Sequence, residues 1–285
     1  MNEGAAMGSP ILGSCRLLVY LLWTVLLIPA QYLAVALRHP LRKRIPPFYH
    51  RVCARILGFR VEAVGQPADA PTLFISNHSS YLDITILGSL APVSFVAKSE
   101  VAGWPFFGLL AKLQETVFIE RTKRAGTARQ ADDIKGRLEA GDSLILFPEG
   151  TSSDGNRVLP FKTALFAVAN TRVDGRPLTV QPVSVTATHL DGIPLGHGMR
   201  TLYSWFGDMD LVPHLWQVFT LGTMTVVVEF HPPVTVDSFA GSRKALADHC
   251  QARVAAGVSR AVTGRRPEAV APPSPSPVPV PAPAS

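Results

Sequence analysis

Cysteine is scarce in this chain, and the cysteines that occur are far apart. Only three of 285 residues are cysteine, at Cys15, Cys53 and Cys250, and no C-x-x-C or zinc-binding spacing occurs. Buried, reduced thiols are therefore favoured over a disulfide framework or a structural zinc site. The sequence also lacks the G-x-S-x-G turn of a serine nucleophile, which argues against an α/β-hydrolase. Because no cluster of metal-ligating residue types stands out, we expect neither a metal nor a bound cofactor.

Charged side chains make up only 17% of the chain, and basic residues outnumber acidic ones by 27 to 21. A basic surface suits either nucleic acid or the anionic face of a membrane. The 47% hydrophobic content favours the membrane. The sequence contains neither a nucleic-acid-binding motif nor an aromatic stacking pattern, so we do not expect a nucleic-acid partner.

An apolar run near the N-terminus is the clearest structural signal. Residues 17–37 carry no charged side chain and are numerous enough to cross a bilayer as a helix. One basic residue, Arg16, precedes the run and several follow it, so the positive-inside rule places the C-terminal side in the cytoplasm. We predict a retained single-pass or anchoring helix. A cleaved signal peptide and a helix in the membrane plane are the alternatives.

The remaining sequence divides into segments of different composition. Residues 1–16 precede the anchor, and residues 38–70 mix basic with apolar side chains, as in a helix on anionic lipid or a solvated linker. Residues 71–266 have the pattern of a catalytic domain. Residues 267–285 contain eight prolines and predict a disordered tail, either passive or used for recognition.

Strand-like and helix-like runs alternate within residues 71–266. Strands are predicted at 73–75, 93–97, 116–119, 143–147, 178–185 and 225–230, and helices at 83–90, 127–140, 160–170 and 237–262. This alternation indicates an α/β fold with a mixed sheet flanked by helices. In such a fold we expect functional motifs at the strand-to-helix turns.

A histidine and an aspartate follow the first predicted strand, five positions apart. Within one helix such positions are about 140° apart and would not face each other. They can meet if His78 lies on the loop and Asp83 in the first helical turn, with Ser79 or Ser80 as the N-cap. The carboxylate would fix the imidazole tautomer, leaving the second ring nitrogen to accept a proton from an alcohol. Alone, the H-x4-D pattern is weak, because such pairs arise by chance and a lone histidine is more often structural.

A second polar turn follows the strand predicted at 143–147. Pro148 ends the ladder of that strand, and Gly150 permits a ligand to approach the backbone closely. Glu149 and Thr151 flank the glycine. The same sequence also suits an ordinary Pro-Gly turn. Combined with a histidine–aspartate pair, however, it supplies what acyl transfer to an alcohol requires.

Four blocks in order resemble the lysophosphatidic acid (1-acylglycerol-3-phosphate) acyltransferase family, within the glycerophospholipid acyltransferases. They are NHSSYLD at 77–83, FIER at 118–121, FPEGT at 147–151 and VQPV at 180–183, and the resemblance covers about residues 71–233. It implies that His78, paired with Asp83, deprotonates an acceptor hydroxyl that attacks the thioester of acyl-CoA or acyl-carrier protein. The acceptor-binding residues that it implies are Arg121, Glu149, Gly150, Thr151 and Lys162.

The resemblance predicts transfer to the sn-2 hydroxyl of 1-acylglycerol 3-phosphate, forming phosphatidic acid in a bacterial inner membrane with the catalytic domain in the cytoplasm. Two departures favour an alternative acceptor, because Glu115 replaces the family's glycine and Ser152 its frequent arginine. Residues 97–101 and 207–214 are similar to bacterial lyso-ornithine lipid acyltransferases, whose acceptor has no phosphate. Lyso-ornithine lipid is therefore the alternative acceptor.

Two further features leave alternatives open. The basic residues Lys98, Arg121, Lys123, Arg124, Arg157 and Lys162 predict either a cationic acceptor site or a solvated basic face. The apolar run at 104–110 could border an acyl chain, enter lipid or pack in the core. A non-catalytic membrane protein that recruits partners is the remaining possibility, which the histidine–aspartate pair disfavours.

Overall fold

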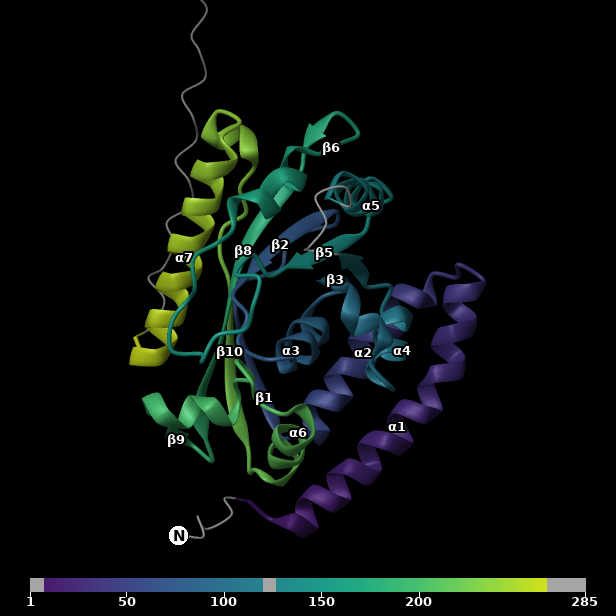
Figure 1. The fold of residues 1–285 in the computed structure, drawn as a ribbon, viewed down its shortest axis with the longest axis vertical. Coiled ribbons are helices and arrows are strands. Elements are labelled where there is room, and N and C mark those ends of the chain that lie inside the picture. Colours follow the sequence, from purple (N-terminus) through teal and green to yellow (C-terminus); the bar gives the residue numbers. More distant parts are fainter. Residues whose placement is uncertain (1–7, 120–126, 266–285) are drawn as a thin grey trace, which may run out of the picture.

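A computed structural model of the chain describes residues 8–119 and 127–265, and Figure 1 shows its α/β fold. The described part contains a mixed sheet flanked by helices, which confirms the predicted fold class. Arg121, Lys123, Arg124 and the predicted tail at 267–285 lie outside the described residues.

The helices and strands follow the predicted alternation. The α-helices are α1 (Pro10–Ala36), α2 (Leu41–Ile56), α3 (Leu82–Leu90), α4 (Phe107–Leu113), α5 (Thr127–Glu139), α6 (Leu211–Thr220) and α7 (Arg243–Thr263). The strands are β1 (Phe59–Val64), β2 (Thr72–Ser76), β3 (Val93–Lys98), β4 (Val117–Ile119), β5 (Ser143–Leu146), β6 (Arg172–Val173), β7 (Arg176–Pro177), β8 (Thr179–Leu190), β9 (Ile193–Pro194) and β10 (Met224–Phe230). Short 3-10 helices are η1 (Ser99–Gly103), η3 (Thr163–Asn170), η4 (His197–Leu202) and η5 (Val236–Phe239).

The main sheet in the described residues has eight strands, with seven in the order β1-β10-β8-β2-β5-β3-β4 and β9 beside β8. Neighbours run parallel except where β8 meets β10 and β9. The central strands β2 and β5 are buried along their whole length, which explains the unbroken apolar runs at residues 73–75 and 144–146. Because β1 pairs with β10, the sheet begins before residue 71, where the sequence analysis placed the start of the domain.

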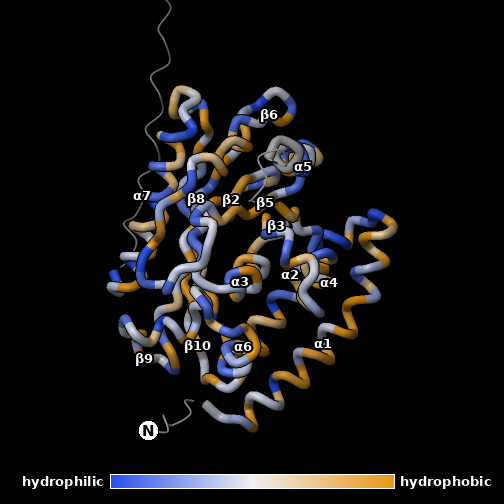
Figure 2. The backbone as a smooth tube through the Cα atoms, viewed as in Figure 1, coloured by the Kyte–Doolittle hydropathy of each residue, from blue (hydrophilic) through white to orange (hydrophobic). Residues whose placement is uncertain are grey.

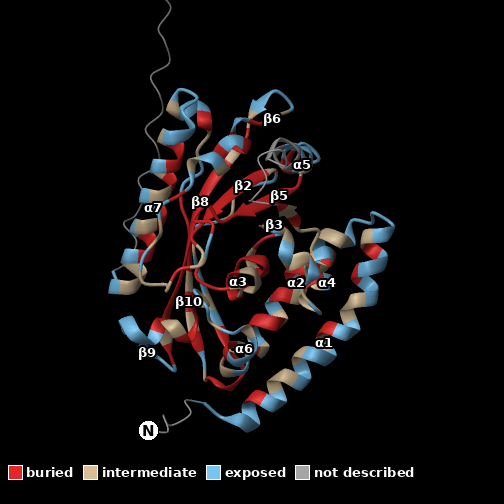
Figure 3. Ribbon diagram, viewed as in Figure 1, coloured by how far each residue is buried: buried red, intermediate tan, exposed pale blue. Residues whose placement is uncertain are grey.

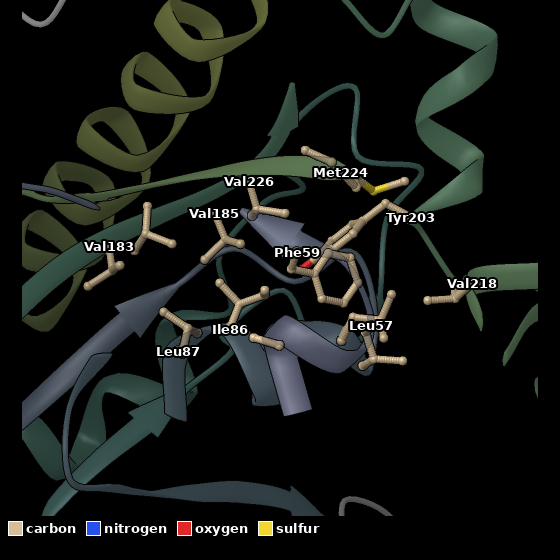
Figure 4. Packing of buried hydrophobic residues seen from close by; sticks show 14 of the residues in the cluster. Leu57, Phe59, Ile86, Leu87, Val183, Val185, Tyr203, Val218, Met224 and Val226 are labelled. Carbon is tan, nitrogen blue, oxygen red and sulfur yellow. The ribbon is translucent and has the colours of Figure 1, made fainter. Parts of the chain in front are cut away.

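Two apolar layers enclose the sheet. One layer contains residues of α2, α3 and α6, and the other contains residues of α5, η3 and α7. Figure 3 shows the strands as the buried centre of the molecule. In Figure 4, Ile86 of α3 points toward Val185 and Val226 of the sheet, and Tyr203 lies beside Phe59. The first layer thus packs around α3, which begins four residues after His78.

A buried polar cluster lies between α7 and the sheet. His231 approaches the Ser184 hydroxyl at 3.3 Å through Nε2, and Arg260 donates a 2.7 Å hydrogen bond to Glu229. Burial lowers the pKa of His231 to about 4. A Cβ atom added to Gly257 would lie 2.2 Å from the Ser184 oxygen. The close approach of α7 to β8 therefore depends on glycine at position 257.

The helix predicted at 160–170 is shorter than expected and is a 3-10 helix, η3. Its first amides are bonded elsewhere: Phe161 N–H donates to the Gln251 side chain and Lys162 N–H to the Pro148 carbonyl, each at 2.9 Å. These bonds hold the backbone outside a helix until Thr163.

The closing helix predicted at 237–262 is interrupted near its start. Ala240 and Gly241 adopt left-handed backbone angles, with φ of 51° and 76°, which ends η5. The Ser242 side chain then caps α7 by accepting a hydrogen bond from Ala245 N–H at 3.2 Å. Only the second, longer part of the prediction is therefore α-helical.

The apolar helix α1 begins at Pro10, earlier than the charge-free run at 17–37 predicted. Ser9 caps it, and proline is well suited to a first helical position. Ser9 N–H also donates to the Thr220 carbonyl at 2.9 Å, and Gln31 donates to the Leu113 carbonyl at 2.8 Å. Both ends of α1 are thus tied to the domain, along which Figure 1 shows the helix running.

The outward face of α1 is apolar and exposed, as Figures 2 and 3 show. It carries the exposed side chains of Ile11, Leu18, Val19, Leu22, Val25, Leu26, Tyr32 and Leu33. By length and composition this helix is a candidate membrane span. The following segment is not a solvated linker, because α2 buries Pro46, His50 and Cys53.

Candidate active site

His78 and Asp83 meet as their spacing predicts. His78 lies in the loop after β2, Asp83 lies in the first turn of α3, and their Nδ1 and Oδ2 atoms are 2.9 Å apart. The predicted N-cap is wrong, because Tyr81 occupies that position without a side-chain cap. The amides of Ser79 and Ser80 instead donate to Asp83 Oδ2, at 2.8 and 3.0 Å.

Asp83 is completely buried, and each of its oxygens has its own partners. Oδ2 is bonded by His78 and two backbone amides, while Oδ1 accepts a 2.7 Å hydrogen bond from the Tyr203 hydroxyl. Both oxygens of this buried carboxylate are therefore hydrogen-bonded, as buried polar groups require. Burial, followed by the charge of Asp83, raises the pKa of Tyr203, which keeps its hydroxyl a donor. Sequence reasoning missed Tyr203, because its sequence neighbourhood carries no recognised motif.

The imidazole of His78 is also held from one side. Its ring stacks on Phe147 at a centroid distance of 4.2 Å and an interplanar angle of 22°. With Nδ1 bonded to Asp83, Nε2 is the nitrogen available to a substrate. The side chain is 24% exposed and lines a cavity, so an acceptor can reach it.

The second predicted turn holds the loop of His78. Glu149 Oε1 accepts a 3.2 Å hydrogen bond from His78 N–H, and Ser153 N–H donates to the His78 carbonyl at 2.9 Å. Burial raises the pKa of Glu149 to about 8, against the opposing effect of the His78 and Leu159 amides. The carboxyl is therefore largely protonated at neutral pH. The two hydrogen bonds to the backbone of His78 show that this turn positions the loop that carries the histidine.

The cavity beside His78 has a volume of about 420 Å³ and mostly apolar walls. Residues of α1, α2, α3 and α4 line it, together with the loop that follows β5 and the loop that precedes α6. Gly150 and Thr151 line it with His78, which brings three predicted site residues together. Neither Glu149 nor Lys162 lines the cavity. Glu149 is buried elsewhere in the domain, and Lys162 is exposed on its surface. Their predicted roles in acceptor binding remain predictions.

The apolar run at 104–110 contributes directly to this cavity. Trp104, Phe107 and Leu110 all lie in its wall, so part of the run borders the space beside His78. From α1, Leu27 and Ile28 reach the same space. The helix predicted to contact the membrane therefore also forms part of the active-site wall.

Glu115 does not line the cavity. Its carboxylate accepts two hydrogen bonds of 2.6 Å from Arg42 on α2, which fixes the end of α4 to the N-terminal helices. In the sequence, Glu115 argues against a phosphate-bearing acceptor, but the ion pair turns this charge toward α2. Ser152, the other departure, does line the cavity.

A histidine that is fixed by a buried aspartate beside a large apolar cavity can remove a proton from an alcohol. On an α/β fold, this arrangement fits an acyltransferase with an alcohol as its acceptor. Comparison with known proteins supports the same class, because a family model described as "Acyltransferase" matches residues 60–186.

The chain belongs to this acyltransferase family and is an enzyme that acylates lysolipids. It is 46% identical to a lyso-ornithine lipid O-acyltransferase of Brucella abortus, over 85% of this chain and 92% of the relative. It is 32% identical to a 1-acyl-sn-glycerol-3-phosphate acyltransferase of Neisseria gonorrhoeae, over 59% and 63% respectively. The crystal structure of PlsC, the 1-acyl-sn-glycerophosphate (LPA) acyltransferase of Thermotoga maritima, shares the fold. The TM-score is 0.60 at 21% identity, with 90% of this chain and 100% of that chain covered.

Proposed function

We propose that this chain acylates the free hydroxyl of lyso-ornithine lipid. The observation that carries the proposal is the 46% identity to a relative with that activity in its name, across nearly the whole of both chains. A second such relative, from Rhizobium meliloti, is 42% identical over 81% of this chain. Ser152 in the cavity wall supports the same acceptor, because a guanidinium there would suit a phosphate better.

Acylation of 1-acylglycerol 3-phosphate is the second candidate. It is supported by the FIER block, whose Arg121 would bind the phosphate, and by the similarity to the Neisseria relative. That similarity covers a smaller share of the chain at lower identity, so we rank this acceptor below lyso-ornithine lipid.

The site geometry supports direct transfer of the acyl group. His78 Nε2 removes the proton of the acceptor hydroxyl, and the oxygen attacks the thioester carbon of acyl-CoA or acyl-carrier protein. Asp83 stabilises the imidazolium that forms. When the tetrahedral intermediate collapses, the carbon–sulfur bond breaks and the thiolate takes the proton from His78. The products are the acylated lipid and the free thiol.

We propose that the enzyme works on the cytoplasmic face of a bacterial inner membrane. The apolar outward face of α1 would enter the bilayer while both of its ends stay tied to the domain. On α2, exposed Arg44 and Arg55 would face anionic headgroups, with Phe48 between them in the sequence. The lysolipid could then enter the cavity without leaving the membrane.

The acceptor is tested by supplying purified protein in detergent with a thioester donor and, separately, each lysolipid. Release of free thiol reports turnover, and acyl-CoA and acyl-carrier protein are compared as donors. We expect lyso-ornithine lipid to give the higher kcat/KM. Turnover with 1-acylglycerol 3-phosphate alone would contradict the proposal and support the second candidate.

A further inference from the structure

Three aromatic side chains from separate segments meet at the wall of the active-site cavity. Trp205 lies edge-to-face with Trp104 at a centroid distance of 6.1 Å and with Tyr81 at 5.9 Å. All three rings line the cavity that contains His78. The Tyr81 hydroxyl is 3.0 Å from His214 Nδ1, which holds this ring in place. The cavity therefore contains a fixed aromatic wall close to the catalytic loop.

Two charged side chains of opposite sign line the same cavity. Lys98 ends β3, and Glu100 lies in η1, the short helix that Trp104 follows. Both side chains are exposed, and neither forms an ion pair with another residue in the described ranges. An anionic group, a cationic group and three aromatic rings thus line one cavity whose walls are otherwise mostly apolar.

This combination matches a zwitterionic headgroup better than a purely anionic one. An ammonium group is attracted both by a carboxylate and by the faces of tryptophan rings. A phosphate would be attracted by Lys98, but it would be repelled by Glu100 and would gain nothing from the rings. When the α-amine of ornithine carries an acyl chain, the headgroup retains one carboxylate and one side-chain ammonium. The carboxylate is complementary to Lys98, and the ammonium is complementary to Glu100.

We propose that Glu100, Trp104 and Trp205 form a binding subsite for the side-chain ammonium of the acceptor, while Lys98 binds its carboxylate. The inference rests on the proposed function, because it names the part of lyso-ornithine lipid that the site recognises. It assigns specificity to described residues outside the four sequence blocks. The acceptor is thereby selected by its positive charge as well as by its hydroxyl.

The test compares lyso-ornithine lipid with the same lipid acetylated on its side-chain amine, which removes the positive charge. We expect the wild-type enzyme to prefer the unmodified lipid by at least about fivefold in kcat/KM, in keeping with a cation held by aromatic and anionic groups. Glu100→Gln and Trp205→Leu should each lower this preference toward one. Glu139→Gln, at an exposed acid on α5, and Trp216→Leu, at an exposed tryptophan on α6, should retain it.

The outcomes separate this inference from the proposed function. If the wild-type enzyme acylates both ornithine lipids equally well, the ammonium subsite is wrong and the proposed function stands. The subsite is also wrong if Glu100→Gln lowers kcat/KM equally for both lipids. Turnover with 1-acylglycerol 3-phosphate alone would overturn the proposed function together with the subsite.

Discussion

The Tyr203 hydroxyl donates a 2.7 Å hydrogen bond to Asp83 Oδ1, while the other oxygen of that carboxylate is bonded to His78. The two oxygens therefore have partners on different sides, which fixes the rotation of the carboxylate. The Tyr203 ring is itself held edge-to-face by Phe59, at a centroid distance of 6.0 Å. Through Asp83, the core of the domain thus sets the orientation of the catalytic imidazole.

Replacing Tyr203 with phenylalanine should slow catalysis without removing the ring from the core. The loss of one hydrogen bond to a charged group costs about 1.5–3 kcal/mol. If half of this is expressed in the transition state, kcat falls by about 4- to 13-fold. Steady-state kinetics should show a fall in kcat with a nearly unchanged KM for the acceptor. Tyr32→Phe, on the exposed face of α1, is the matched control, and equal kcat values for both variants would argue against the role of Tyr203.

Removing the general base should have a much larger effect. His78→Ala is expected to lower kcat at least about 100-fold, the lower end for loss of a general base. The variant is tested by thiol release after circular dichroism has shown that it folds. His197→Ala, at an exposed histidine outside the cavity, should retain activity. Wild-type turnover by folded His78→Ala would end the proposed mechanism.

The Arg42–Glu115 ion pair should contribute to stability and not to acceptor binding. Both side chains are about one-quarter exposed, so solvent screening limits the expected coupling energy to about 1 kcal/mol. A double-mutant cycle of Arg42→Gln and Glu115→Gln, followed by urea unfolding, measures it. The exposed pair Arg60 and Glu62 should give no measurable coupling. A large change in acceptor KM with unchanged stability would instead place Glu115 in the binding site.

Position 257 on α7 should not tolerate a side chain. In Gly257→Ala the new Cβ would lie 2.2 Å from the Ser184 oxygen, and the overpacking should cost about 1–3 kcal/mol of unfolding free energy. Ser184→Ala in the same chain should recover part of this loss by removing that oxygen. Gly136→Ala, on α5 with open space around it, should be neutral or stabilising. Equal stability of the two alanine variants would refute the close packing of α7.

Glu149 should make stability depend on pH in a predictable direction. Its pKa is raised to about 8 from an ordinary value of 4.5, so the folded state binds more protons between these values. The resulting stability is complete below pH 4.5 and is lost as pH rises through 8. In Glu149→Gln, whose amide cannot titrate, this loss should be absent. Denaturant unfolding at pH 5 and pH 9 should therefore favour the glutamine variant at the higher pH, and parallel profiles would contradict the raised pKa.

The sequence could predict the site where the determining contacts are local. His78 and Asp83 meet across one strand-to-helix turn, so their spacing alone restricts how they can face each other. The short apolar runs at β2 and β5 identify buried strands for the same reason, because each pattern is complete within a few residues. The N-cap prediction failed because Tyr81 occupies the cap position, while Ser79 and Ser80 precede it and donate their amides to Asp83.

Contacts between distant segments could not be predicted from the single sequence. Tyr203 reaches Asp83 across 120 positions, and Arg42 reaches Glu115 across 73. Asn77 exchanges two 2.9 Å hydrogen bonds with the backbone of Val185, which ties the catalytic loop to β8. No local pattern encodes such partners, because tertiary packing decides which polar groups meet in the interior.

The order of the segments along the chain has a consequence for synthesis. The apolar helix α1 leaves the ribosome well before Leu113 and Thr220, which hold its two ends. During that interval both faces of α1 lack their protein partners, and the lipid bilayer is the apolar surface that can cover them. Tyr203 also follows late, so α1 is available to a bilayer before the catalytic pair is fully oriented. With the membrane location proposed above, the enzyme would complete its catalytic site at the surface that supplies its lipid substrate.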